Sequence, residues 1–201
     1  MREQGLCAHR RVHRTRTTKS EPGARIAPNL LDQDFTAARP NEKWAGDITA
    51  IWTYEGWLYL AVVLDLFSRR VVGWAMAASQ DETLIETAFR MALLGRCPPV
   101  GLLFHSDRGS QYTSDAYRAV LTGMSVTVSM SRTGNCYDNA VTESFFGTLK
   151  GECVERISFQ TRREAKQTIF EYVECFYNRV RRHSSLGYVS PVAYEQVMCY
   201  P

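Results

Sequence analysis

The sequence has no long apolar run, and this absence excludes a membrane-spanning helix. Its longest uninterrupted apolar stretch, Trp57 to Leu64, ends at Asp65 and is far shorter than the roughly 20 residues that such a helix needs. The first residues, Met1 to Leu6, also contain no apolar segment of the kind found in a secretory signal. We therefore expect a soluble cytoplasmic protein that makes no contact with a membrane.

The sequence also lacks any C-x-x-C pair. Its six cysteines are scattered along the chain, and no second cysteine lies within finger-like reach of Cys7, His9 and His13. A closed zinc site needs four ligands. We therefore interpret the cysteines as reduced thiols.

Overall charge is small, but its distribution is uneven. The formal net charge of the 201 residues is +3, with 24 lysines and arginines against 21 acidic residues. Residues 1–28 hold seven of the basic residues and two glutamates, a net charge of +5. A basic arm on a nearly neutral body indicates a polyanionic partner, most simply nucleic acid. A solvated leader is the alternative.

Composition divides the chain into four segments. Residues 1–28 form the basic arm, and residues 29–40 lie in a stretch rich in proline and poor in large apolar residues, which is typical of a linker. Residues 41–157 hold the predicted core. Residues 158–201 are expected to form a C-terminal helix and a basic tail that pack on this core.

The hydrophobic pattern predicts an α/β fold. Three β-branched apolar runs at 44–52, 58–65 and 70–77 are separated by short loops, which favours an antiparallel meander. Helical periodicity follows, with Asp81 as a candidate N-cap. The remaining predicted elements are a helix at 81–96, strands at 101–105 and 125–130, and helices at 114–121, 138–153 and 162–178. We therefore expect a mixed five-stranded sheet, three antiparallel strands and then two more, flanked by helices.

Three carboxylates stand out against this pattern. Asp47 lies inside the first predicted strand, Asp107 follows the fourth, and Glu143 lies on a predicted helix. Each has an ordinary structural interpretation: a bond to neighbouring backbone for Asp47, a turn for Asp107 and a solvated surface for Glu143. A carboxylate in a strand interior nevertheless costs several kcal/mol unless it is paired or bound to a cation.

Together the three carboxylates predict a metal site. If the two strands are adjacent, Asp47 and Asp107 lie side by side, and a helix packed alongside could bring Glu143 to the same point. Oxygen ligands suit Mg²⁺ or Mn²⁺. Two such ions about 4 Å apart could activate the attacking oxygen and stabilise the leaving oxygen at a phosphodiester.

These residues resemble the DDE triad of bacterial insertion-sequence transposases and retroviral integrases. Thirty-five residues separate Asp107 from Glu143, as in the D-D-35-E spacing. The sequence around each carboxylate and in the tail is also similar, over 44–49, 63–69, 105–112, 138–146 and 177–187. The tail resembles the insertion-sequence-three group in particular, and the resemblance covers roughly residues 35–197.

The resemblance implies a ribonuclease H-like fold and a DNA transposase catalytic domain, the second-frame product of its element. Such an enzyme cleaves DNA and transfers the strand without a covalent protein intermediate, using two Mg²⁺ or Mn²⁺ ions held by Asp47, Asp107 and Glu143. Implied partners are element ends, target DNA and further copies of the chain on DNA, which would associate it with the nucleoid. Because Met1 to Leu6 resembles only the tail of a helix-turn-helix segment, an upstream-frame DNA-binding partner is also implied.

Basic and polar residues outside the triad are candidates for DNA contact. Lys150 is two helical turns after Glu143, where integrases present a DNA-contacting lysine. Gln111 and Tyr112 follow Asp107 as in the family, with turn packing as the alternative. The other candidates are arginines of the tail and of the arm, Arg179, Arg181, Arg182, Arg10, Arg11, Arg14 and Arg16.

Two other functions remain open from the sequence. One is a hydrolytic nuclease of the same fold, which would cut DNA without joining it. The other is a non-catalytic DNA-binding remnant of a transposase. The presence of all three carboxylates argues against the remnant.

Overall fold

The computed structural model describes residues 26–113, 117, 120–121, 123–132 and 136–199. The strands are β1 (Lys43–Thr53), β2 (Gly56–Asp65), β3 (Val71–Ala77), β4 (Leu103–Ser106) and β5 (Thr127–Met130). The α-helices are α1 (Glu82–Arg96), α2 (Ser110–Thr113), α4 (Ala140–Glu152), α5 (Arg162–Phe170) and α6 (Pro191–Cys199). Short 3-10 turns span Cys136–Asn139, Val154–Arg156 and Ser184–Leu186, and a π-helical segment spans Glu171–Tyr177.

The five strands form one mixed sheet in the order β3-β2-β1-β4-β5. β1, β2 and β3 pair antiparallel, whereas β4 pairs parallel to β1 and β5 parallel to β4. The predicted meander followed by two more strands is therefore confirmed, with β1 at the centre of the sheet.

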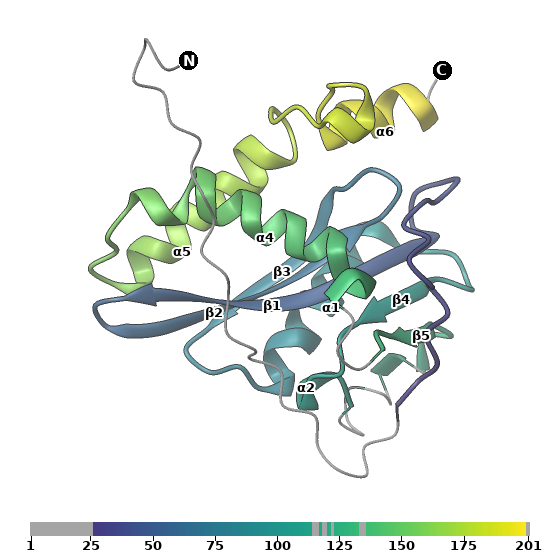
Figure 1. Ribbon diagram of the computed structural model, residues 1–201, viewed down its shortest axis with the longest axis horizontal. Helices are drawn as coiled ribbons and strands as arrows, with labels where there is room; N and C mark the ends of the chain where they lie inside the picture. The colour runs from purple at the N-terminus through teal and green to yellow at the C-terminus, as the bar shows by residue number, and fades with distance from the viewer. Residues whose placement is uncertain (1–25, 114–116, 118–119, 122, 133–135, 200–201) are drawn as a thin grey trace.

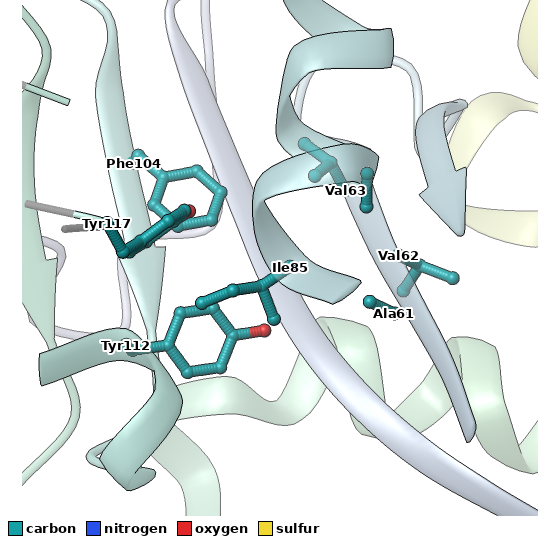
Figure 2. A pocket seen from close by; sticks show the side chains of 8 residues that line it. Ala61, Val62, Val63, Ile85, Phe104, Tyr112 and Tyr117 are labelled. Atoms are coloured by element: carbon teal, nitrogen blue, oxygen red, sulfur yellow. The ribbon is translucent and has the colours of Figure 1, made fainter. Parts of the chain in front are cut away.

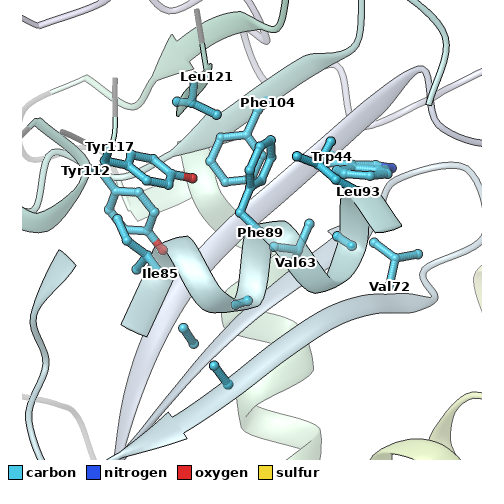
Figure 3. Close-up of a cluster of buried hydrophobic side chains, with 14 of the residues drawn as sticks. Trp44, Val63, Val72, Ile85, Phe89, Leu93, Phe104, Tyr112, Tyr117 and Leu121 are labelled. Atoms are coloured by element: carbon cyan, nitrogen blue, oxygen red, sulfur yellow. The ribbon is translucent and has the colours of Figure 1, made fainter. Parts of the chain in front are cut away.

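Helices cover both faces of this sheet (Figure 1). Trp44 and Ile48 of β1 belong to the apolar cluster under α1, which Figure 3 shows gathered around Phe89. Ile51 belongs to the cluster under α4 and α5. Because successive side chains of a strand face opposite sides, Asp47 shares the α4 face with Ile51.

Capping explains where α1 begins and ends. The Asp81 side chain accepts a hydrogen bond from the backbone of Leu84, 3.1 Å away, as predicted for an N-cap. The helix ends at Cys97, whose φ of 43° lies in the left-handed region.

Two predicted helices differ in detail. The chain enters α4 through a 3-10 turn, so that the α-helix begins at Ala140 rather than at Asp138. The helix predicted at 162–178 is present, but its second half is π-helical. The helix predicted at 114–121 lies largely outside the described residues.

The segment before the sheet packs on the core, unlike the spacer expected of residues 29–40. Leu31 is 2% exposed and lies against Ala45 and Leu66. The backbone N–H groups of Leu30 and Leu31 donate to Ser129 Oγ at 2.9 and 3.1 Å. We call residues 26–35 the strap, and Figure 1 shows it in purple beside β4 and β5.

The C-terminal helix α6 is joined to the core by Glu195, which is 8% exposed. Its carboxylate accepts hydrogen bonds from Ser68 Oγ at 2.8 Å, from Arg70 at 2.8 Å and from Arg96 at 2.8 and 2.9 Å. We call these four residues, together with Asp65, the corner cluster.

In the part of the chain that the structure describes, no helix has both the length and the apolar character needed to cross a membrane.

Candidate active site

Strand register brings Asp47 and Asp107 together. Ala45 of β1 is paired with His105 of β4 in the parallel ladder. Asp47 lies two residues further along β1, and Asp107 lies two residues after His105, directly after the end of β4. Side chains at matching positions of neighbouring strands point to the same face. The predicted adjacency of the two strands is thus confirmed, and both aspartates are half-buried at this position.

Two glycines permit this close arrangement. A Cβ on Gly46 would lie 2.6 Å from the Phe104 ring, so a larger residue there would force the ring or β1 to shift. A Cβ on Gly109 would lie 2.9 Å from Gln111 Oε1 and 3.1 Å from Asp107 Oδ1. The Gly109 N–H donates to that same Asp107 oxygen at 2.9 Å, which fixes the carboxylate in the turn after β4.

Glu143 reaches the site from the helix that crosses β1. It lies in the first turn of α4, is exposed, and is carried by a helix that packs on β1 through the buried cluster under α4 and α5. The three carboxylates therefore come from the interior of β1, the turn after β4 and the first turn of α4, as the sequence predicts.

The pKa of the Asp47 carboxyl is raised well above its usual range. Burial is the main cause, and the negative charges of Asp107 and, more weakly, Glu143 add to it. The backbone N–H of Ile48, which donates to Asp47 Oδ1 at 2.7 Å, and the positive charge of Lys150 oppose the increase. Asp47 thus interacts electrostatically with both other carboxylates and with Lys150.

The donor chemistry of this group fits a hard divalent cation. All three side chains offer only carboxylate oxygens, which Mg²⁺ and Mn²⁺ prefer, and a cation would relieve the repulsion that raises the Asp47 pKa. Within the described ranges, no three histidine, cysteine or acidic side chains stand arranged as a ready set of metal ligands.

The residues proposed to contact DNA beside the triad differ in their placement. Lys150 is half-buried on α4 near Asp47. Gln111 is half-buried, and its side-chain amide donates to the carbonyl of Gln80 at 2.9 Å. Tyr112 is only 3% exposed; the structure does not present it for DNA contact, and turn packing, the alternative interpretation, describes it better.

The Tyr112 ring lies instead among apolar side chains on the α1 face. Its centroid is 6.5 Å from that of Phe104 and 5.9 Å from that of Tyr117. Figure 2 shows the three rings with Ile85 around a narrow pocket that has no room for a water molecule. This pocket is a packing feature of the core and not a ligand site.

The tail arginines also separate into two kinds. Arg181 makes three hydrogen bonds of 2.7 to 3.0 Å to the Glu152 carboxylate, so the structure uses it to hold the end of α4. Arg179 and Arg182 are exposed, and no carboxylate of the described residues lies within 4 Å of either. The predicted contacts of Arg10, Arg11, Arg14 and Arg16 lie outside the described residues.

Sequence reasoning missed one residue beside the site, Asp138. It is fully buried and accepts hydrogen bonds from Arg132, Asn29 and Gln33. These partners hold the pKa of Asp138 well below its usual range, chiefly through Arg132. No periodicity or spacing in the sequence indicates this pairing, because Asn29 and Gln33 are more than 100 residues away along the chain.

Comparison with known proteins identifies the family that the chain resembles. Two family models, both described as integrase core domain, match residues 37–136 and 143–198. The transposase InsF for insertion sequence IS3A of Escherichia coli is 47% identical over 195 residues, which are 97% of this chain and 68% of that protein. An insertion element IS600 uncharacterized 31 kDa protein of Shigella sonnei is 47% identical over 94% of this chain and 70% of its own length.

Solved structures share the fold at low sequence identity. The catalytic core domain of HTLV-2 integrase, in complex with magnesium, matches with a TM-score of 0.61 at 15% identity, over 79% of this chain and 99% of that one. A simian T-cell lymphotropic virus intasome matches with a TM-score of 0.68 at 16% identity, over 91% of this chain and 62% of the matched chain. The mixed sheet and its flanking helices thus form an integrase-type, ribonuclease H-like fold. The chain belongs to the insertion-sequence transposases that carry an integrase core domain.

Proposed function

We propose that this transposase catalytic domain cuts DNA strands and joins them to a target by direct phosphoryl transfer at Asp47, Asp107 and Glu143. The observation that carries the proposal is the side-by-side placement of Asp47 and Asp107 on β1 and after β4, with Glu143 acting on Asp47 from α4. Carboxylates that converge and raise one another's pKa, as at Asp47, are expected at a functional site more often than at a structural one.

Asp47, Asp107 and Glu143 would together hold Mg²⁺ or Mn²⁺, two ions in the active complex. Bound there, such ions polarise the phosphodiester and stabilise the charge that develops on the attacking and leaving oxygens. The protein supplies the position of the ligands: the β1–β4 ladder and the Gly109 N–H hold the two aspartates, and α4 brings Glu143. The HTLV-2 integrase core, which has this fold, was solved in complex with magnesium.

The reaction needs no covalent protein intermediate. In cleavage, a water oxygen attacks phosphorus, and the bond to the 3′ oxygen breaks as that oxygen takes up a proton. In joining, the freed 3′-hydroxyl attacks a target phosphodiester, so again one phosphorus–oxygen bond forms and one breaks. Lys150, half-buried on α4 near Asp47, is suited to contact a DNA phosphate beside the reacting one.

DNA binding and assembly complete the proposed function. The exposed Arg179 and Arg182 and the arginines of the basic arm would neutralise phosphates outside the site. An intasome among the fold's relatives supports assembly of several copies on DNA. A DNA-binding partner from an upstream frame would supply recognition of the element ends.

A strand-transfer assay tests the proposal. Full-length protein is incubated with DNA carrying the ends of its element, labelled target DNA, and Mg²⁺ or Mn²⁺, with Asp107→Asn as the matched control. Joined products from wild type and none from the variant are expected. Nicks without joined products would instead identify a hydrolytic nuclease, and binding without any cleavage would identify a non-catalytic remnant.

A further inference from the structure

The buried carboxylate of Asp138 connects three separate segments near the site. Arg132, which follows β5, donates from its backbone at 2.7 Å and from its guanidinium at 2.9 and 3.1 Å. From the strap, Asn29 Nδ2 donates at 3.1 Å and Gln33 Nε2 at 3.0 Å. Asp138 itself lies in the 3-10 turn that leads into α4. Five hydrogen bonds therefore fix this turn to the strap and to the end of β5.

Helix α4 depends on this anchor because its own N-cap is weak. The N-cap residue Asn139 makes no side-chain hydrogen bond to the first turn of α4. Such a bond is the usual device that fixes the start of a helix. The nearest fixed side chain before the first turn is Asp138, and the first turn carries Glu143.

The strap supports the second aspartate in the same way. Ser129 Oγ, which accepts from the strap N–H groups of Leu30 and Leu31, also lies 2.8 Å from His105 Nδ1. The other ring nitrogen of His105 is 3.1 Å from Ser131 Oγ. His105 lies in β4 two residues before Asp107. One short segment thus connects to the elements that carry two of the three carboxylates.

The backbone of the strap is strained where it reaches Asp138. Asp32 and Gln33 have φ angles of 43° and 64°, in the left-handed region that disfavours residues other than glycine. A glycine would adopt this turn without strain. A glutamine at this position keeps instead the side chain that donates to Asp138. Strain retained beside a site is a reason to look for a functional role.

We propose that Asn29 and Gln33 are positioning residues, which act through Asp138 to hold the first turn of α4 and place Glu143 against Asp47 and Asp107. This inference rests on the proposed function and deepens it. The strap contacts Asp138 and Ser129, which lie in or beside the elements that carry Glu143 and Asp107.

Gln33→Gly separates positioning from stability. The substitution removes the donor to Asp138 Oδ1, which lowers stability, and also relieves the strained φ, which raises it, so thermal stability is expected to stay close to that of the wild type. Gln33→Lys, which keeps a donor to Asp138, should rescue the defect. Asp34→Asn is the matched control, because Asp34 lies in the same strap but bonds Lys43 Nζ at 2.7 Å.

Two measurements on the full chain decide the proposal. Calorimetric titration with Mn²⁺ alone should give a Kd about tenfold higher for Gln33→Gly, the size of effect seen when groups that orient metal ligands are removed. Strand-transfer kinetics should show kcat lowered by a similar factor with the KM for end DNA unchanged. Gln33→Lys and Asp34→Asn should stay within twofold of the wild type in both.

The outcomes separate this inference from the proposed function. If wild type binds Mn²⁺ and joins ends while Gln33→Gly matches it, or if Asp34→Asn loses as much as Gln33→Gly, the positioning role alone is wrong. If wild type neither binds Mn²⁺ nor joins ends, the proposed function is wrong and the positioning role falls with it.

Discussion

Two groups of acidic side chains in the protein have opposite electrostatic surroundings. In the corner cluster, Glu195 is held by Arg70, Arg96 and Ser68, and these contacts hold its pKa below its usual value. Asp47, by contrast, faces two further carboxylates, and its pKa is raised by burial and by their charges. Asp65, at the floor of the corner cluster, also has a raised pKa because its complete burial outweighs its hydrogen bonds.

The two groups differ in whether arginines of the protein neutralise the acidic charge. At the joint between α6 and the sheet, arginines are close enough to neutralise the acid, and the product is a tight structural contact. Within β1 and just after β4, repulsion among carboxylates is retained. Such an arrangement costs stability, so it is expected only where another cation or a substrate makes use of it.

Removing one carboxylate of the triad should give the largest effect on activity. Asp107→Asn is expected to lower strand transfer by at least about a thousandfold, because the loss of one ligand weakens charge stabilisation worth several kcal/mol in the transition state. Asp47→Asn and Glu143→Gln should behave alike. Joined DNA products are quantified on denaturing gels.

The same variants should not lose stability. Each removes a charge that repels its neighbours, so the free energy of unfolding should stay constant or rise in chemical denaturation. Activity within a few-fold of wild type in any one of the three variants would contradict the assignment of the triad.

Removing the Glu195 carboxylate of the corner cluster should lower stability and leave activity unchanged. Glu195→Ala leaves Arg96, whose side chain is only 14% exposed, without its closest partner, and breaking a buried pair in this way costs about 3 kcal/mol. Urea unfolding measures the loss. Activity per folded molecule should be unchanged, and a stability within about 0.5 kcal/mol of wild type would show that the arginines find other partners.

Divalent cations should distinguish the two groups directly. A ligand that binds only the folded state stabilises it by about 2.7 kcal/mol at a hundred times its Kd. Mn²⁺ is therefore expected to raise the melting temperature of wild type and of Glu195→Ala, and to lose this effect in Asp107→Asn. An equal shift in all three proteins would indicate binding elsewhere.

Most of the framework could be predicted from the sequence because it depends on local patterns. Alternating apolar residues predict β1 to β3, Asp81 predicts the start of α1, and the carboxylates inside or after strands predict the site. The role of residues 29–35 could not be predicted. Their composition is typical of a linker, and what holds them is a set of contacts with Ser129 and Asp138, about 100 residues away. The burial of Tyr112 and the pairing of Arg181 also depend on such tertiary contacts.

Acid should weaken the corner cluster over a defined range. The folded-state pKa of Glu195 is lowered from 4.5, chiefly by Arg96 against the opposing effect of burial, so its contribution to stability is complete above the unfolded value. It is lost as the pH falls through the lower folded value. Between pH 5 and 3, wild type should therefore lose more unfolding free energy than Glu195→Gln, by about 1.4 kcal/mol for each unit of pKa difference. Equal slopes would show that Asp65, which also pairs with Arg96, takes up the proton instead.

The smallest expected effect concerns two adjacent arginines of the tail. Arg182 is exposed, whereas Arg181 is occupied by Glu152 at 2.7 Å. If Arg182 touches a phosphate, Arg182→Ala should reduce the slope of log affinity for DNA against log salt by about 1, since each neutralised phosphate releases counterions. Arg181→Ala should leave that slope unchanged and lower stability, because among the described residues Glu152 would keep Tyr172 alone as a donor. Fluorescence anisotropy at several salt concentrations, with thermal melts of both variants, measures the two effects. A reduced slope in Arg181→Ala with unchanged stability would mean that Glu152 releases Arg181 when DNA binds. Arg181 would then pair with Glu152 in the free protein and with a phosphate in the complex.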